Sequence, residues 1–376
     1  MHGTPRRGKL IHAPIAPPLT PQPLMPHDHP IPPHDMTPTP VAPVTGHNPQ
    51  LIDVSRGTMV ESRHRAAFAV ADTDGRIVLS AGDFERPVYA RSAIKPLQAL
   101  PLIESGAAEA YALSNAEIAL ACASHSGEPR HVETVLAWLA RIGCAPADLE
   151  CGSHLPKNDT AMRALLRDRV EATPAHNNCS GKHAGFLTLA RHIGAAPKGY
   201  IAYQHAVQQR VLGALETMTG LDLGTAPRGI DGCGIPVIGI PLGNLALAFA
   251  RLTDPRDQPE ARQAACERVC AAMAAEPFMV AGSDRYCTRV ITATGGDALV
   301  KTGAEGVYCG ALPKLGLGIA LKVDDGAQRA AEVLMGQLLR HFGVLDESQA
   351  ELLIEPLRNC AGTRVGEVRP TADFPV

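Results

Sequence analysis

The stretch that decides the fold class is DALVKTGAEGVYCGALPKLGLGIALKV, residues 297–323. It contains three short apolar runs separated by turns that carry glycine, which is the pattern of three strands in a meander. The segment that follows, AQRAAEVLMGQLLRHFG at residues 327–343, has apolar residues at helical spacing. We therefore predict three neighbouring sheet strands and then one last helix.

A second group of strands is expected earlier in the chain. Residues 65–82 read RAAFAVADTDGRIVLSAG, two extended runs around an Asp-Gly pair that is typical of a hairpin turn. Between the hairpin and the meander, residues 92–277 have mainly the pattern of helices, several of which end at glycine. We predict an α+β fold, with a five-stranded, largely antiparallel sheet flanked by helices and a separate helical block.

Residues 1–50 differ in composition from the rest of the chain. They hold 14 of the 32 prolines and six of the 15 histidines, without a periodic apolar segment. Such a segment cannot bury enough apolar surface to offset the entropy lost on ordering. We predict a disordered Pro-rich tail over residues 1–50 and one folded domain over residues 51–376.

The charge balance and the lengths of the apolar runs limit the class of partner. There are 35 basic and 38 acidic residues, a formal charge of -3, which does not favour nucleic acid or a polybasic membrane contact. No apolar run reaches the roughly 18 residues of a membrane span, and prolines interrupt any N-terminal signal core. We expect a cytoplasmic protein with a small-molecule substrate, and neither a nucleic-acid nor a membrane partner.

A Ser-x-x-Lys motif, Ser92 to Lys95, stands at the predicted start of the helical block. Residues three apart at a helix start share one face, so the Lys95 amine can reach the Ser92 hydroxyl. A desolvated, neutral lysine is one known activator of a serine nucleophile. The alternative is an ordinary helix cap at Ser92 with Lys95 as a surface charge.

Two further motifs follow in a meaningful order. Ser124 and Ser126 form Ser-x-Ser in a loop between helices, and Lys301 begins Lys-Thr-Gly on the first meander strand. The order resembles the plan of serine β-lactamases and penicillin-binding proteins, in which such motifs surround one acyl-transfer site. Ser126 replaces their usual asparagine, which puts a bulky peptide or β-lactam substrate in doubt.

Five segments together carry a closer resemblance: RSAIKPLQ, ASHSGE, CSGKHAG, DGCGIP and KTGAEGVYCGA. They resemble the bacterial asparaginase II family, similar to rhizobial inducible asparaginases, over about residues 59–321. The resemblance implies a fold similar to serine β-lactamases and glutaminases. It also implies hydrolysis of L-asparagine to aspartate and ammonia, and a homodimer.

The resemblance places paired catalytic groups on Ser92 with Lys95 and on Ser124 with Lys301. In the expected mechanism, Ser92 is deprotonated by Lys95 and attacks the side-chain amide carbon, after which water hydrolyses the aspartyl ester. Ser124, supported by Lys301, relays a proton to the departing ammonia. The reverse assignment, with Ser124 as nucleophile and Ser92 as relay, stays open.

The resemblance also implies a zinc ion near the site, with Cys179, Lys182 and Cys287 as ligands, to which we assign a positioning role. The two cysteines are otherwise read as buried, unliganded thiols. The charged ends of the amino-acid substrate need partners, and three residues are candidates: Arg91, His183 and Asp231. His183 and Asp231 could instead be capping or turn residues.

Two rival functions follow from the same residues. One is a different amidase, either a thiol enzyme that uses Cys179 or a zinc-water hydrolase. The other is a ligand-binding sensor on the same scaffold, which is acylated but does not turn over. Steady release of ammonia beyond one equivalent separates an enzyme from a sensor.

Overall fold

The computed structural model describes residues 47–374. The predicted tail, residues 1–50, lies almost entirely outside the described residues. Its last residues belong to the folded domain, because Asn48 is buried and its side-chain amide donates to Asp324 Oδ1 at 2.7 Å. The first strand, β1, begins at Gln50.

An antiparallel sheet of eight strands forms one layer of the domain, in the order β10-β11-β1-β2-β9-β8-β7, with β3 paired to β2. The strands are β1 (Gln50–Arg56), β2 (Met59–Ala71), β3 (Ile77–Ala81), β7 (Leu299–Thr302), β8 (Val307–Leu312), β9 (Leu317–Val323), β10 (Glu355–Arg358) and β11 (Arg364–Pro370). The predicted hairpin is β2 with β3, and the predicted meander is β7 to β9. The α+β class is confirmed.

The predicted number of five strands is wrong. The strand β2 has 13 residues, and its first half extends past the hairpin to pair with β1. The strand β11 pairs with β1 and β10 pairs with β11, which adds three strands. The first half of β2 reads MVESRHR. Its first five positions alternate between exposed and half-buried, and the buried sixth is His64, so this half lacks the apolar pattern that marks a strand in sequence.

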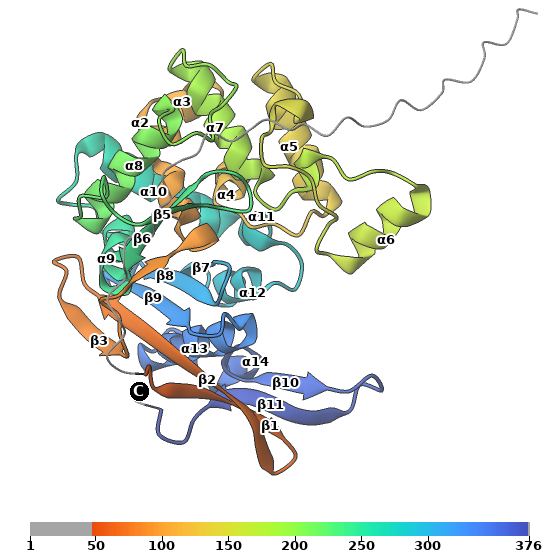
Figure 1. The fold of residues 1–376 in the computed structure, drawn as a ribbon, viewed down its shortest axis with the longest axis vertical. Helices are drawn as coiled ribbons and strands as arrows, with labels where there is room; N and C mark the ends of the chain where they lie inside the picture. Colours follow the sequence, from red (N-terminus) through yellow and green to blue (C-terminus); the bar gives the residue numbers. More distant parts are fainter. Residues whose placement is uncertain (1–46, 375–376) are drawn as a thin grey trace, which may run out of the picture. The chain divides into compact units, whose positions relative to one another are not determined.

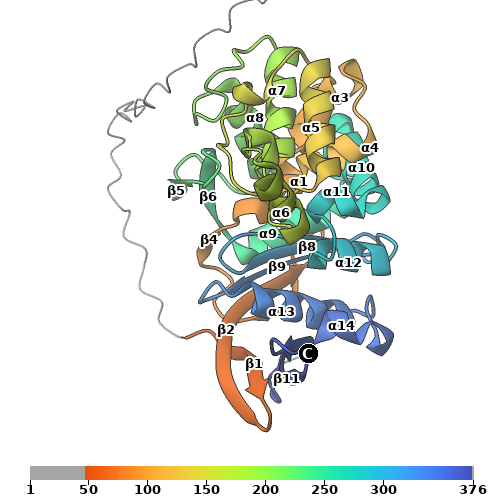
Figure 2. The same ribbon diagram turned by 90° about the vertical axis from the view of Figure 1, so that its right-hand side faces the viewer.

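Helices cover both faces of this sheet (Figures 1 and 2). The helix α9 (Leu242–Thr253) packs on β2, β8 and β9, and α13 (Gln328–His341) packs on β1, β8, β9 and β11. The contact of α9 is close: a Cβ at Gly318 on β9 would lie 1.9 Å from the Ala246 carbonyl oxygen. Figure 2 shows α13 and α14 on one side of the sheet and the helical block on the other.

The helical block is built from short and medium helices. They are α1 (Lys95–Gln98), α2 (Leu100–Glu104), α3 (Ala107–Ala110), α4 (Asn115–Ala121), α5 (Pro129–Arg141), α6 (Asp159–Asp168), α7 (Ser180–His192), α8 (Ala206–Thr219), α10 (Glu260–Ala275) and α11 (Pro277–Ala281). After it come α12 (Tyr286–Ala293) and, near the end of the chain, α14 (Ala350–Leu353). No helix among residues 47–374 is long and apolar enough to cross a bilayer.

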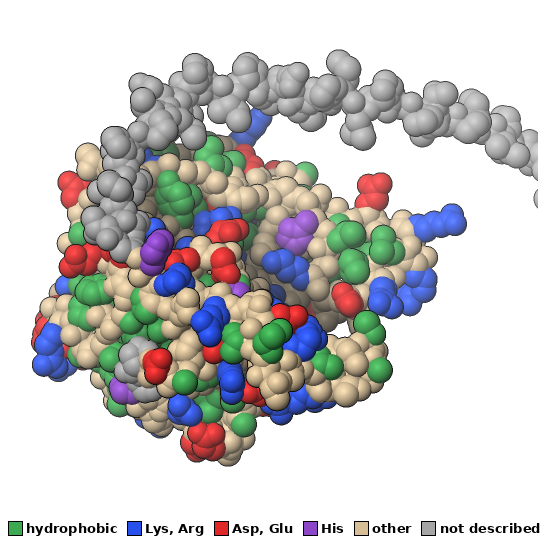
Figure 3. Space-filling view, turned by 60° about the horizontal axis from the view of Figure 1, so that its bottom comes forward, with side chains coloured by type: hydrophobic (Ala, Val, Ile, Leu, Met, Phe, Trp, Pro, Cys, Tyr) green, Lys and Arg blue, Asp and Glu red, His purple; other side chains and the backbone are tan. Residues whose placement is uncertain are grey.

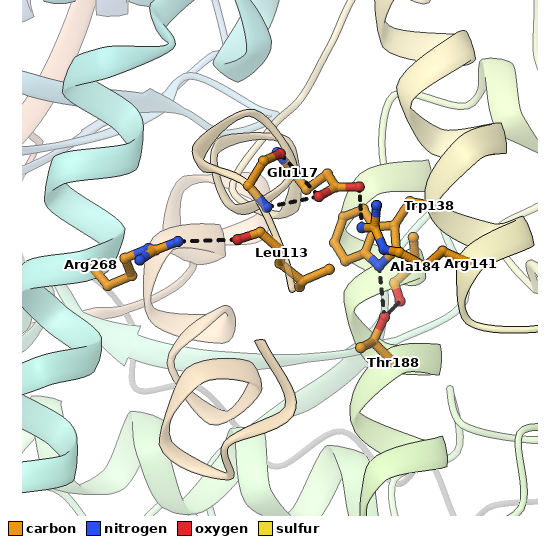
Figure 4. A network of polar contacts seen from close by, with 8 residues as sticks. Leu113, Glu117, Trp138, Arg141, Ala184, Thr188 and Arg268 are labelled. Atoms are coloured by element: carbon orange, nitrogen blue, oxygen red, sulfur yellow. Dashed lines mark hydrogen bonds and ion pairs between the residues drawn. The ribbon is translucent and has the colours of Figure 1, made fainter. Parts of the chain in front are cut away.

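Polar contacts lock the helices that carry the site residues (Figure 4). Ser114 and Glu117 form a capping box at the start of α4, and Glu117 also pairs with Arg141 of α5. The indole N–H of Trp138 on α5 donates to Thr188 Oγ1 of α7 at 2.9 Å. Hydrogen bonds of this kind each contribute about 1 kcal/mol when both partners are buried. The network fixes α4, which leads into Ser124, against α7.

A second, three-stranded sheet lies beside the helical block, in the order β4-β6-β5. Its strands are β4 (Pro87–Tyr89), β5 (Arg228–Ile230) and β6 (Pro236–Pro241). Arg91 follows β4 closely, and Asp231 follows β5 directly. Since β4 and β5 both pair with β6, this small sheet brings two segments about 140 residues apart to one place.

Candidate active site

Ser124 lies in the loop that follows α4, with its hydroxyl between two buried lysines. Lys301 Nζ donates to Ser124 Oγ at 2.8 Å, and Lys95 Nζ donates to the same oxygen at 3.1 Å. The two lysines are 0 % and 1 % exposed. Each amine also donates to a backbone carbonyl, that of Thr302 for Lys301 and that of Ala123 for Lys95.

The environment of Lys301 makes its amine a proton acceptor near neutral pH. Burial, followed by the positive charge of Lys95, lowers the pKa of Lys301 to about 7. A lysine loses its charge when desolvation outweighs the nearby negative charges. The neutral amine can take the proton of Ser124 at a distance of 2.8 Å.

Ser92 is not a hydrogen-bond partner of the Lys95 amine among the described residues. It lies in a short 3-10 helix, Arg91–Ile94, and is half-buried. The Lys95 amine donates a hydrogen bond to Ser124, whereas the Ser-x-x-Lys motif predicted a contact between Lys95 and Ser92. The helical spacing does put both residues at one helix start, but the long side chain of Lys95 turns into the core and ends at Ser124, Ala123 and Cys179.

The backbone before Ser92 is held in an unusual conformation. Arg91 has φ 51°, in the left-handed region, which costs a residue with a side chain about 1–3 kcal/mol unless its surroundings enforce it. Its guanidinium is fixed by Asp231, with Nε 3.0 Å and NH2 3.4 Å from the two carboxylate oxygens. Gly303 permits a close approach from β7, since a Cβ there would lie 2.8 Å from the Ala90 carbonyl oxygen.

A pocket opens beside these groups, and it collects several of the predicted residues. Its polar lining consists of Gln98 and five of the predicted residues: Arg91, Ser92, Lys95, Lys182 and Asp231. Apolar residues of the second sheet and the turn before it form the other wall. The pocket therefore presents a guanidinium, a carboxylate, a hydroxyl and amines. Its volume in this structure is about 10 Å³, roughly the space of one water molecule, so an amino acid can enter only when the pocket widens.

The charge state of Asp231 suits contact with a cation. Burial by itself would raise the pKa of Asp231, but the hydrogen bonds from Arg91 and the charge of Lys182 lower it below its ordinary value. The hydrogen bond to Asp231 likewise raises the pKa of Arg91. Both groups are thus ionised at neutral pH.

His183, predicted to contact the substrate, lies elsewhere. It is 0 % exposed and hydrogen-bonds through Nδ1 with the Tyr200 hydroxyl at 2.7 Å, and it is not a lining residue of the pocket. Burial lowers the pKa of His183 well below its usual range. Successive helix residues point about 100° apart, so α7 turns Lys182 to the pocket and His183 to the core.

Two thiols and one amine form a cluster next to Ser124, made of Cys179, Lys182 and Cys233. Lys182 Nζ donates to Cys233 Sγ at 3.0 Å, and Cys179 Sγ accepts from Lys95 Nζ at 3.2 Å. The hydrogen bond from Cys233 lowers the pKa of Cys179 well below that of a free thiol, despite burial, and the charges of Lys95 and Lys182 act in the same direction. Cys179 is therefore the thiolate of the cluster.

The predicted third zinc ligand, Cys287, is not in this cluster. Its Sγ lies 2.9 Å from the Tyr308 hydroxyl, on the face of α12 that packs on the sheet. Cys233 takes the expected place beside Lys182. Cys233 belongs to DGCGIP, one of the five segments that carry the family resemblance, but no role was predicted for its thiol. Within residues 47–374, no three His, Cys, Asp or Glu side chains are arranged to hold a metal.

The packing of α7 on α4 positions the cluster. A Cβ at Gly181 would lie 2.2 Å from the Leu120 carbonyl oxygen, so only glycine allows this approach. The approach sets the first turn of α7, with Cys179 and Lys182, against the end of α4 that leads to Ser124.

Comparison with known proteins assigns the chain to a family. The family model described as L-asparaginase II matches residues 52–370. The chain belongs to the L-asparaginase II family. As a member, it is an enzyme that hydrolyses amides. A search of curated proteins gives no match.

Solved structures give only distant alignments. Mglu in its native form aligns with 16% identity and a TM-score of 0.44, over 79% of this chain and 69% of Mglu. A β-lactamase from Mycobacterium bovis aligns with 15% identity and a TM-score of 0.37, over 74% of this chain and 95% of that protein. The family assignment rests on the family model, and the predicted likeness to serine β-lactamases stays a prediction.

Proposed function

We propose that this L-asparaginase II family member hydrolyses L-asparagine to aspartate and ammonia by acyl transfer through Ser124. One observation carries the proposal: the Ser124 hydroxyl accepts hydrogen bonds from both Lys301 and Lys95, beside a pocket with paired cationic and anionic side chains. A serine with an adjacent base of pKa near 7 is an activated nucleophile.

In the first half of the reaction, neutral Lys301 removes the proton of Ser124 as Oγ bonds to the side-chain amide carbon of the substrate. The C–N bond then breaks, and the proton held by Lys301 passes to the leaving nitrogen, which departs as ammonia. In the second half, Lys301 removes a proton from water as the water oxygen bonds to the acyl carbon. The ester bond between that carbon and Ser124 Oγ then breaks, and Lys301 returns the proton to Oγ as aspartate leaves. Lys95 donates to the Ser124 oxygen and stabilises its negative charge.

The pocket accounts for recognition of an amino acid. The half-exposed Arg91 binds the substrate carboxylate, and Asp231 binds the ammonium group. Ser92, on the pocket wall, donates or accepts a hydrogen bond at the amide. This gives Ser124 the nucleophilic role, which is the reverse of the first assignment from sequence, and makes Ser92 a contact of the substrate amide.

We further propose that the thiol cluster binds zinc, through Cys179, Lys182 and Cys233. The donor set fits the metal, because thiolate sulfur is a preferred zinc ligand and Cys179 is readily ionised. Lys182 must lose a proton to bind. Burial favours that loss, but the interactions with Cys233 and Cys179 outweigh it and raise the pKa of Lys182. A bound zinc would supply a fixed positive charge beside the pocket and so help position the substrate.

An ammonia-release assay tests the function. With purified protein, L-asparagine should give steady release far beyond one equivalent per chain. A β-lactam should stay intact, as followed by the ultraviolet absorbance of its ring, because its hydrolysis would release no ammonia. Release that stops at one equivalent would favour the sensor. If Ser124→Ala keeps full activity and Cys179→Ser loses its activity, a thiol amidase is favoured. If Ser124→Ala keeps an activity that depends on zinc, a zinc-water hydrolase is favoured. L-glutamine in parallel measures substrate tolerance.

Three further predictions concern the protein in the cell. The homodimer remains a prediction, which analytical ultracentrifugation can test, and so does the cytoplasmic location. The absence of a nucleic-acid partner is also a prediction. On the face shown in Figure 3, acidic and basic side chains are interspersed, which agrees with the balanced composition.

A further inference from the structure

A second cavity, separate from the pocket beside Ser92, lies between α12, α13, α14 and β10. Its volume is about 250 Å³, and it shares no lining residue with the pocket beside Ser92. Its charged lining consists of six residues: Asp284, Arg285, Arg289, Glu332, Glu351 and Glu355. The proposed reaction uses none of these groups.

The two arginines of the cavity differ in their partners. Arg289 contacts the start of α14, where it donates to the Glu351 carbonyl oxygen at 3.0 Å and lies 3.5 Å from the Glu351 carboxylate. Arg285 donates to Ser126 Oγ at 3.3 Å, and within residues 47–374 no carboxylate oxygen lies within 4.0 Å of it. Arg285 is thus a half-buried guanidinium with donors left for an anion.

The cavity also carries carboxylates with spare acceptors. Glu332 on α13 is half-buried, and one of its oxygens accepts from Gln328 at 2.6 Å. Burial raises the pKa of Glu332, and the charge of Glu355 acts in the same direction, whereas the hydrogen bond from Gln328 and the charges of Arg285 and Arg289 oppose the rise. Glu355 on β10 is exposed and forms no hydrogen bond or ion pair through its carboxylate with any described residue. A cation placed between the two would relieve their mutual repulsion.

We propose that this cavity binds a small zwitterion of the α-amino-acid type, with its carboxylate on Arg285 and its ammonium group between Glu332 and Glu355. A guanidinium binds a carboxylate through two parallel hydrogen bonds, and carboxylates are the matching partners of an ammonium. The volume is smaller than the roughly 300–1,000 Å³ of pockets for drug-sized ligands, and it suits a ligand the size of one amino acid.

The contact between Arg285 and Ser126 affects how the site is tested. Ser126 lies two residues from Ser124, and its hydroxyl donates to the Ala281 carbonyl at 3.0 Å. A change at Arg285 would therefore alter the active-site loop as well as the cavity. The acidic side of the cavity has no such contact with the loop, so the test substitutes Glu332 and Glu355.

The experiment measures binding of L-alanine by calorimetry at millimolar concentrations. L-alanine is a zwitterion without a side-chain amide, so it cannot be hydrolysed. The Glu332→Gln/Glu355→Gln variant should bind one equivalent of L-alanine fewer per chain than the unchanged protein. This holds whether or not L-alanine also enters the pocket beside Ser92. This difference is independent of the proposed amidase function, which the ammonia assay tests.

Matched controls isolate the charge pattern. Propionate, which lacks the ammonium group, and ethylamine, which lacks the carboxylate, should each bind this site at least tenfold more weakly than L-alanine. Glu347→Gln removes an exposed carboxylate, paired with Arg340, that does not line the cavity, and it should leave the stoichiometry unchanged.

Two results would overturn the proposal. One is an equal number of L-alanine equivalents in the unchanged protein and in the folded double variant, with circular dichroism as the check of folding. The other is equal binding of propionate and L-alanine. Should the double variant not fold, Glu355→Gln alone serves, because this residue is exposed; it should weaken L-alanine binding at least threefold, and unchanged affinity counts against the site.

Discussion

Replacing Lys301 with methionine tests the proposed base directly. The substitution keeps a long side chain in the buried space and removes the amine 2.8 Å from Ser124 Oγ. General base catalysis by one positioned group contributes about 10²–10⁴-fold to a rate, and each tenfold step corresponds to about 1.4 kcal/mol. We therefore expect kcat/KM for L-asparagine to fall by about 10²–10⁴-fold, or about 3–5 kcal/mol.

The pH dependence gives this prediction a second readout. Lys301 accepts a proton only when neutral, and its pKa of about 7 means that the neutral form predominates above neutral pH and is lost below it. The plot of kcat/KM against pH should rise to a plateau above pH ~7, and the value at pH 5 should be about one hundredth of the plateau. The residual activity of Lys301→Met should lack this acid limb.

A neighbouring variant checks the cause of the pKa. The charge of Lys95 is, after burial, the next contribution that lowers the pKa of Lys301. Lys95→Gln should therefore move the midpoint of the acid limb to higher pH, because one opposing positive charge is gone. Lys314→Met, at an exposed lysine paired with Asp297, is the matched control and should leave rate and profile unchanged.

Two outcomes would refute the reasoning. If Lys301→Met keeps the acid limb with a midpoint near 7, another group titrates. If it keeps more than a tenth of the kcat/KM of the unchanged enzyme, Lys301 is not the base. Both outcomes are measured as steady-state ammonia release at several pH values. Zinc content is determined on the same samples, so that a change in activity caused by loss of metal can be recognised.

The remaining predictions concern the metal, the nucleophile and the tail. Cys233→Ser should lose bound zinc while Cys287→Ser retains it, as measured by plasma mass spectrometry; retention by the first variant or loss by the second would contradict the ligand set. Ser92→Ala should still accumulate an aspartyl-enzyme on rapid acid quench and Ser124→Ala should not, so that the opposite result in intact-mass spectra restores Ser92 as nucleophile. Deleting residues 1–46 should leave Tm and activity nearly unchanged, and a clear drop in Tm on calorimetry would refute the tail interpretation.

The sequence alone determined the elements with strong local patterns. The alternation around Asp74-Gly75 gave the hairpin of β2 and β3, and the glycine-separated apolar runs gave β7 to β9. The serine and lysine chemistry of the site could also be predicted. The motifs that contain Ser92, Ser124 and Lys301 follow the order found in enzymes that carry out acyl transfer. Such strand and motif patterns depend on residues that lie close together in the chain, so they can be recognised in the sequence.

Tertiary structure decided which of those groups meet. Lys95 lies three residues from Ser92, yet its amine bonds to Ser124, because the long side chain follows the packing of the core and not the helix spacing. Cys233 and not Cys287 lies beside Lys182, since the turn after β5 folds over α7 while α12 faces the sheet. Such contacts join residues far apart in the chain, and their distances are set by how helices and strands pack.

The same reason explains the missing strands. The strand β11 pairs with β1 across more than 300 residues, with Val54 opposite Val368, and both residues are buried. Each strand is short and mixed in polarity, and each becomes a strand because the other offers hydrogen-bonding partners. A local pattern shows which residues prefer an extended conformation, whereas the partner that makes the sheet exists only in the folded chain.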